Sequence, residues 1–195
     1  MIQGKNIVET DRLFLRCLTM KDVDSALEIF SDKVAMVFSR LKNREEVKER
    51  IQWNLDSYDK NGFGLWACIL KSTGQFVGLC GVILHEDIDG KREREISYHF
   101  IRKFWGQGFA TEAARACKNY GFDHCGFLRL ISIIDPEHTA SRKVAERVGM
   151  TLDKEVIWIN RRFHVFSIRT GLLRRGERGQ ACNHGIFLTD FYGCS

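Results

Sequence analysis

A glycine-rich segment, Trp105–Thr111, has the residue types and spacing of a phosphate-binding turn. It reads Trp-Gly-Gln-Gly-Phe-Ala-Thr and falls between an expected strand and an expected helix. Gly106 and Gly108 allow a sharp turn and place no Cβ in the path of a ligand. The first N–H groups of a helix lack internal partners and lie at the positive end of its dipole. We expect this segment to cradle a phosphate or pyrophosphate, although a plain strand-to-helix turn would carry the same glycines.

Two other phosphate-binding loops do not match this segment. A P-loop requires G-x-x-x-x-G-K-[ST], and the dinucleotide fingerprint requires a third glycine. The chain has Thr111 at the position of that third glycine. Neither nucleotide-binding class is indicated.

Two longer stretches resemble the acetyl-coenzyme A motif of the GNAT superfamily of N-acetyltransferases. They are Glu95–Ala114, which contains Trp-Gly-Gln-Gly-Phe-Ala-Thr-Glu-Ala, and Asp135–Met150. Glu9–Arg16 fits the RimJ/RimL-like branch, the ribosomal-protein N-acetyltransferase type, and the resemblance extends over residues 8–170. It implies direct transfer of an acetyl group from acetyl-CoA, without a metal, to a primary amine. That amine is either a protein N-terminus or a small molecule.

The resemblance also implies which residues hold the coenzyme. Main-chain amides over Gly106–Thr111 would cradle the pyrophosphate. The strand end at Phe100 and Ile101 would pair with the pantetheine arm like an added strand, and His138 and Ser141 would lie near the thioester or the arm. The implied set is Phe100, Ile101, Gly106, Gln107, Gly108, Phe109, Ala110, Thr111, His138 and Ser141.

Two positions depart from the superfamily pattern. Trp105 occupies a slot that usually holds Gln or Arg, while Gly108 and Ala110 match. His138 stands where the second motif commonly has Asn, which bears on one side-chain contact to the coenzyme arm. Main-chain N–H groups make most phosphate contacts in the superfamily, so Trp105 is not expected to abolish them. The departures leave open an alternative, a non-catalytic CoA-binding sensor or interaction module.

Acyl transfer needs a base for the amine, a donor for the thioester oxygen and a proton for the departing thiolate. We favour Glu95 as the base, because it opens the strand before the glycine-rich segment and matches, within about one residue, the strand glutamate that acts as base in the histone-acetylating branch. Glu93 and His99 are the alternatives. A main-chain N–H near Phe100 would face the oxyanion, and Ser141, or a water bound to it, would protonate the thiolate.

Other side chains are candidates for the acceptor pocket. Arg161 and Arg162, in the last expected hairpin turn, would favour an acceptor that carries negative charge. The aromatic candidates, most of which are equally compatible with core positions, are Trp53, Tyr58, Phe63, Trp66, Trp158 and Phe163.

Periodicity and capping signals predict the elements that position these residues, in the order β-α-α-β-β-β-α-β-α-β-β. Hairpins around one strand–helix–strand crossover give an α/β (α+β) fold of the GNAT type. We expect a mixed, mostly antiparallel sheet of six to seven strands with about four helices, and a charged loop at Glu86–Arg94. Residues 1–170 are expected to form one domain. Residues 171–195 are expected to form a C-terminal extension, disordered or docked.

Composition excludes several other classes. Thirty Lys and Arg against 25 Asp and Glu give a mild charge of +5, and no basic stripe indicates specific nucleic-acid binding. No apolar run approaches the roughly 18 residues of a membrane span. The start of the sequence lacks the apolar core of a secretory signal, so we expect a cytoplasmic protein. The seven cysteines contain no C-x-x-C pair and are expected to be reduced thiols. Separately, the apolar segment Ile186–Leu188 would allow a homodimer contact.

Overall fold

The strands of the protein form one mixed sheet. The computed structural model describes residues 6–171, in which eight strands pair in the order β1-β2-β3-β4-β5-β6-β8-β7. All neighbours are antiparallel except β5 and β6. The strands are β1 (Asn6–Glu9), β2 (Leu13–Arg16), β3 (Leu65–Leu70), β4 (Phe76–Ile88), β5 (Lys91–Phe100), β6 (Arg129–Ile134), β7 (Thr151–Trp158) and β8 (Arg161–Arg169).

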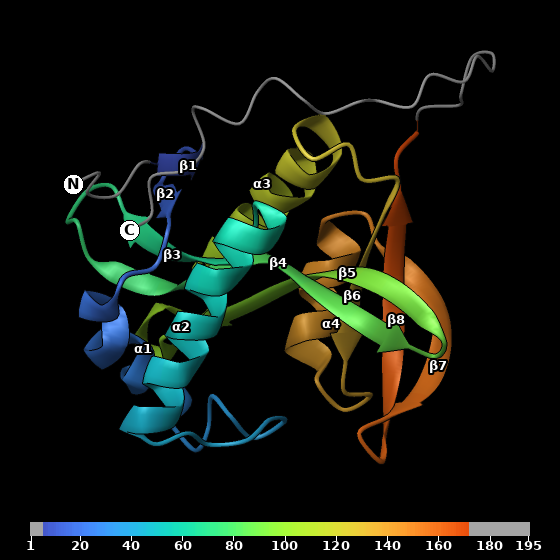
Figure 1. Ribbon diagram of the computed structural model, residues 1–195, viewed down its shortest axis with the longest axis horizontal. Helices are drawn as coiled ribbons and strands as arrows, with labels where there is room; N and C mark the ends of the chain where they lie inside the picture. Colours follow the sequence, from blue (N-terminus) through green and yellow to red (C-terminus); the bar gives the residue numbers. More distant parts are fainter. Residues whose placement is uncertain (1–5, 172–195) are drawn as a thin grey trace.

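Helices cover both faces of this sheet (Figure 1). One face packs on α1 and α2 and the other on α3 and α4, with a separate apolar core on each side. The helices are α1 (Val23–Phe30), α2 (Arg44–Asn61), α3 (Phe109–Asp123) and α4 (Thr139–Arg147), with short 3-10 turns η1 (Met20–Asp22) and η2 (Arg102–Phe104). The predicted class and element order are confirmed, and β1 is an additional strand at the edge of the sheet. Of the predicted extension, all but Gly171 lies outside the described residues.

Local sequence signals explain where the helices begin and end. The Asn43 side chain accepts a hydrogen bond from the Glu46 N–H at 3.0 Å, and the Glu46 carboxylate accepts one from the Asn43 N–H at 2.8 Å. This reciprocal capping starts α2 as the sequence predicts. The helix ends at Gly62, whose φ of 77° lies in the left-handed region that glycine tolerates best.

The expected charged loop at Glu86–Arg94 is wrong, because β4 and β5 continue through it as a hairpin. The turn consists of Asp89 and Gly90, with φ values of 54° and 74°. Two successive positive φ angles define the tight turn that Asp-Gly favours between antiparallel strands. The Asp-Gly pair is therefore the sequence signal for this hairpin turn. The many charged residues around it led to the prediction of a loop instead.

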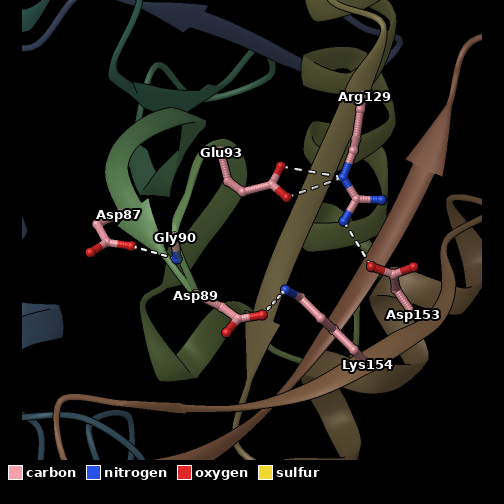
Figure 2. Close-up of polar contacts among 7 residues, drawn as sticks. All are labelled: Asp87, Asp89, Gly90, Glu93, Arg129, Asp153 and Lys154. Carbon is pink, nitrogen blue, oxygen red and sulfur yellow. Dashed lines mark hydrogen bonds and ion pairs between the residues drawn. The ribbon is translucent and has the colours of Figure 1, made fainter.

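The charges on this hairpin contact the other half of the sheet (Figure 2). Glu93 on β5 accepts from Arg129 on β6 at 3.3 Å, and Arg129 also bonds Asp153 on β7 at 2.9 Å. Asp89 forms an ion pair with Lys154 on β7. These contacts join the two halves of the sheet at the end where β5 and β6 begin.

Beyond this network, β5 and β6 share a single paired position, Glu95 with Ile131. Ser132 Oγ then donates to the Ile96 carbonyl at 2.9 Å. The remainder of β5, from Ser97 to Phe100, has β4 as its partner on one side only. An open strand edge therefore faces the gap between β5 and β6.

Candidate active site

A cavity of about 410 Å³ lies where β5 ends and α3 and α4 begin. It contains the predicted coenzyme residues apart from Ile101 and Gln107. From the predicted set it is lined by Phe100, Gly106, Gly108, Phe109, Ala110, Thr111, His138 and Ser141. The structure thus brings together two segments that lie about thirty residues apart in the sequence.

Ile101 and Gln107 lie away from this cavity. The Ile101 side chain is buried in the core beneath α1 and α2, and its N–H donates to the Val77 carbonyl at 3.0 Å. Gln107 donates its side-chain amide to the Lys103 carbonyl, and its own carbonyl accepts from Arg12. Both residues support the segment without facing the space it encloses.

The glycine-rich segment has the backbone that a phosphate cradle needs. Gly106 and Gly108 have φ values of 75° and 82°. A Cβ on Gly106 would meet no atom within 4 Å, so the main chain there borders open space. Gly108 is the N-cap of α3 and has no side chain to occupy the free N–H groups of the first turn. These donors remain available at the positive end of the helix dipole.

The start of α3 is fixed by residues near the beginning of the chain. Thr10 Oγ1 donates to the Glu112 carboxylate at 2.6 Å, and the Arg12 N–H donates to it at 2.9 Å. The Arg12 guanidinium forms an ion pair with Glu112 at 2.6 Å and lies 4.4 Å from the centre of the Phe109 ring. Burial opposes ionisation of Glu112, but these hydrogen bonds outweigh it and lower its pKa. The first turn of α3 is therefore held rigidly against the β1–β2 connection.

Trp105 has a structural role that explains its departure from the superfamily pattern. Its Nε1–H donates to the Phe100 carbonyl at 2.7 Å, and its ring lines the cavity. Alternate residues of a strand point their N–H and C=O groups to the same side. The Ile96 and Phe100 carbonyls both accept bonds on the β6 side, so the main chain of Tyr98 points into the gap as well.

His138 and Ser141 form the opposite wall at the start of α4. His138 is the N-cap, and its Nδ1 accepts from the Ser141 N–H at 3.4 Å. Burial lowers the pKa of His138, which favours the neutral ring that can accept this bond. The imidazole stacks on Phe38, with ring centres 4.4 Å apart. Phe38 belongs to the α1–α2 connection, which therefore contacts the start of α4.

Tyr98 is a site residue that the sequence analysis missed. Its phenolic Oη lies 2.8 Å from Ser141 Oγ and 3.0 Å from the Ser141 carbonyl. Burial raises the pKa of Tyr98, so the phenol keeps its proton. Its position two residues before Phe100 on an alternating strand was the available signal, because both residues must then point to the α3 side.

The three candidate bases occupy different environments. Glu95 lies on the α1 and α2 side of β5, where its Oε2 is 2.7 Å from His85 Nε2 and its Oε1 accepts from the Ile133 N–H at 3.3 Å. It is absent from the residues that line the cavity. Glu93 bonds Arg129 at the far end of the strand (Figure 2) and does not reach the site. His99 does line the cavity, but burial and the nearby charges of Arg50 and Lys42 lower its pKa to about 3.

The acceptor candidates divide between core and surface. Trp66, Tyr58 and Phe63 are buried in the core, and Trp53 lies exposed on α2. Trp158 packs edge-on against His85, with ring centres 5.2 Å apart, and also contacts Phe163.

The arginines of the last hairpin have carboxylate partners in this chain. Arg161 pairs with Asp135 at 2.6 Å and Arg162 with Glu155 at 3.9 Å. Each of these arginines therefore contacts a carboxylate of this chain, and their contribution to an acceptor site stays a prediction.

Within residues 6–171, no helix has the length and apolar character to cross a bilayer. The same part of the chain contains no cluster of three or more His, Cys, Asp or Glu side chains placed to hold a metal ion.

Comparison with known proteins gives consistent similarities. Residues 12–151 match the acetyltransferase (GNAT) domain family. The uncharacterized protein YkkB of Bacillus subtilis (strain 168) is 37% identical over 157 residues, covering 80% of this chain and 91% of that protein. The uncharacterized N-acetyltransferase YoaA of the same organism is 28% identical over 73% of this chain and 81% of its own. The solved structure of RimL, a ribosomal L7/L12 alpha-N-protein acetyltransferase in complex with coenzyme A, has the same fold, with a TM-score of 0.68, 16% identity and coverage of 85% of this chain and 98% of that one.

Proposed function

This chain belongs to the RimJ/RimL-like branch of the GNAT acetyltransferase family, and we propose that it transfers the acetyl group of acetyl-CoA directly to a primary amine. The acceptor is a protein N-terminus or a small molecule. The observation that carries the proposal is the cavity at the start of α3, where a Gly-rich helix start and an open strand edge line one space.

The charge and shape of the cavity fit a diphosphate. Lys143 and Arg147 of α4 line it together with the N-terminus of α3. A helix N-terminus binds anions through its free N–H groups and its dipole. In the proposed complex these donors hold the pyrophosphate, and the open space beside Gly106 lets the phosphate oxygens approach the main chain. A solved structure of RimL, which shares the fold, contains coenzyme A, and this supports the coenzyme as the ligand of this chain.

The free edge of β5 suits the pantetheine arm. Its amides would pair with the main chain of Tyr98 as an added strand does, because both present N–H and C=O groups at the required spacing. This pairing would direct the thioester toward the gap between β5 and β6. The Phe100 N–H faces the same gap and would donate to the thioester oxygen as negative charge develops there.

Two side chains would move protons in the reaction. Glu95 would take the proton of the amine, directly or through one water, as the new C–N bond forms, and His85 would hold its carboxylate in place. As the C–S bond breaks, Ser141, or a water bound to it, would pass a proton to the sulfur and take one from solvent in its place, giving the N-acetylated amine and free coenzyme A. Tyr98, bonded to Ser141, would orient its hydroxyl. Positioning both reactants in one cavity lowers the barrier further.

Two measurements test this proposal. Calorimetry with coenzyme A should show saturable binding at a single site. Purified protein should then release thiol from acetyl-CoA in the presence of at least one member of a panel of small amines and N-terminal peptides, with mass spectrometry showing one added acetyl group. Binding without release against the whole panel would leave a coenzyme-binding protein and contradict the transfer step.

A further inference from the structure

Two cations on the α1 and α2 side of the site lack a carboxylate partner. Within residues 6–171, neither Arg50 nor Lys42 has an acidic side chain within ion-pair distance. Several nearby basic residues differ in this respect, since Arg44 pairs with Asp24 and Lys48 with Glu45. Neighbouring like charges repel, and an anion bound between them would relieve that repulsion.

Each of the two cations lies over an aromatic ring. The Arg50 guanidinium lies over the Trp53 ring, 4.7 Å from its centre. Lys42 Nζ lies 5.1 Å from the centre of the Phe30 ring, which in turn contacts His99 at 5.4 Å. Because His99 lines the cavity, Lys42 is linked to the cavity wall through Phe30 and His99, and the charge of Arg50 acts on the same His99 ring.

Electrostatics indicates that the two cations act on one region. Burial, Arg50 and Arg40 lower the pKa of Lys42 against the opposing effect of Glu46, and both Arg50 and Lys42 contribute to the low pKa of His99. His99 is therefore neutral and adds no charge of its own. Arg50 is also close enough to Glu95 for the carboxylate to act on its pKa, although burial has the larger effect and lowers it. The region carries positive charge beside the proposed base.

We propose that Arg50 and Lys42 bind an anionic group, a carboxylate or a phosphate, that the acceptor carries near its amine. The inference rests on the proposed acetyl transfer and narrows its acceptor to small anionic amines such as amino acids or amine phosphates. Arginine suits this role because its planar fork of donors matches both anions, and lysine adds a second charge. With the anion on this pair, the amine would be directed toward Glu95.

The test compares acceptors that differ only in charge. Free amino acids are paired with their amides, and amine phosphates with the matching amino alcohols, which also separates carboxylate from phosphate. The expected result is a clear preference for one anionic member through a lower KM. In Arg50→Gln and in Lys42→Met that preference, the ratio of kcat/KM for the anionic over the neutral member, should fall about 10- to 100-fold, the range for losing a charged hydrogen bond.

Lys48→Met provides the matched control, because Lys48 lies exposed on the same helix and pairs with Glu45. It should keep the preference of the unmodified protein. Calorimetric titration of the preferred anionic amine into coenzyme A-loaded protein supplies a readout without turnover, and Arg50→Gln should weaken it. Arg50 and Lys42 lie on different elements, so if one of the two variants fails to fold, the other still tests the proposal.

The outcomes separate the two proposals. Coenzyme binding with no turnover of any amine contradicts the proposed function. Turnover with equal kcat/KM for charged and neutral acceptors, unchanged in Arg50→Gln and Lys42→Met, overturns the anion site and leaves the transferase. Preferential acetylation of protein N-termini irrespective of their charge likewise overturns the anion site and leaves the transferase.

Discussion

The hydroxyl groups of Tyr98 and Ser141 lie 2.8 Å apart and join the end of β5 to the first turn of α4. At this point β5 and β6 are no longer paired with each other, so the contact bridges the two walls of the cavity. If Ser141 protonates the thiolate, Ser141→Ala should lower kcat by about 10- to 100-fold, at the low end of acid–base contributions because a thiolate is a good leaving group. Stopped-flow or steady-state thiol release measures this loss of kcat.

Tyr98→Phe separates positioning from proton donation. It removes the bond to Ser141 but keeps the ring that packs in the cavity wall, so kcat should fall less than in Ser141→Ala. Because Tyr98 acts through Ser141, the double variant should be no slower than Ser141→Ala alone. Additive losses would contradict this dependence and give Tyr98 an independent part in the reaction.

Glu95→Gln tests the proposed base. It keeps the shape of the side chain but removes proton acceptance, and kcat should fall by about 100-fold or more. Glu93→Gln is the control, since Glu93 lies two residues away on the same strand and contacts Arg129 (Figure 2). It should reduce stability in urea unfolding while the folded enzyme keeps its kcat. Equal losses of kcat in both variants would place the base elsewhere.

Gly106→Ala tests the phosphate cradle against a close structural match. Gly106 and Gly62 have φ values of 75° and 77°, and a Cβ on either meets no atom within 4 Å. Both alanine variants should therefore lose about 1 kcal/mol of unfolding free energy from the left-handed backbone. Only Gly106→Ala places its methyl group in the cavity, so it alone should weaken coenzyme A binding in calorimetry. Equal coenzyme affinity in the two variants would remove Gly106 from the cradle.

Local signals in the sequence were sufficient for most of the fold. Asn43 and Glu46 cap α2 as their spacing predicts, because capping depends on residues three positions apart. The β1 strand was missed because it has four residues and joins β2 with an irregular register. What identifies β1 as a strand is its pairing with β2, and the periodicity of a few neighbouring residues does not show such pairing.

The backbone conformation of the candidate site was predictable from the sequence. The contacts between side chains from distant segments were not. Gly106 and Gly108 indicate their backbone conformation by residue type alone, because glycine readily adopts positive φ angles. The stacking of Phe38 on His138 joins segments one hundred residues apart, and no local pattern indicates it. Arg161 looked available for an acceptor, but its partner Asp135 comes from another connection. The charge available to an acceptor is therefore set by tertiary pairing.

His99 gives a prediction for stability against pH. Its pKa is lowered to about 3 in the folded protein, by burial first and then by Arg50, Lys42 and His138, from an ordinary value of 6.5. Between these values the unfolded chain binds a proton that the folded chain does not, so stability rises with pH and is lost as pH falls below about 6.5. At pH 4.5 the loss from this residue should be about 2 kcal/mol relative to pH 7. Urea unfolding at both values measures it.

The matched variant for this prediction is His99→Gln, which removes the titrating ring and keeps a polar side chain. Carboxylates such as Asp22, whose pKa is lowered by Arg16 and Thr19 against the effect of burial, also lose stabilising contacts in acid. Their contribution is common to both proteins, so the difference between the two pH dependences isolates His99. The variant should lose about 2 kcal/mol less than the unmodified protein between pH 7 and 4.5. Parallel pH dependences would mean that the folded protein protonates His99 as readily as the unfolded chain does, and that Arg50 and Lys42 do not act on it.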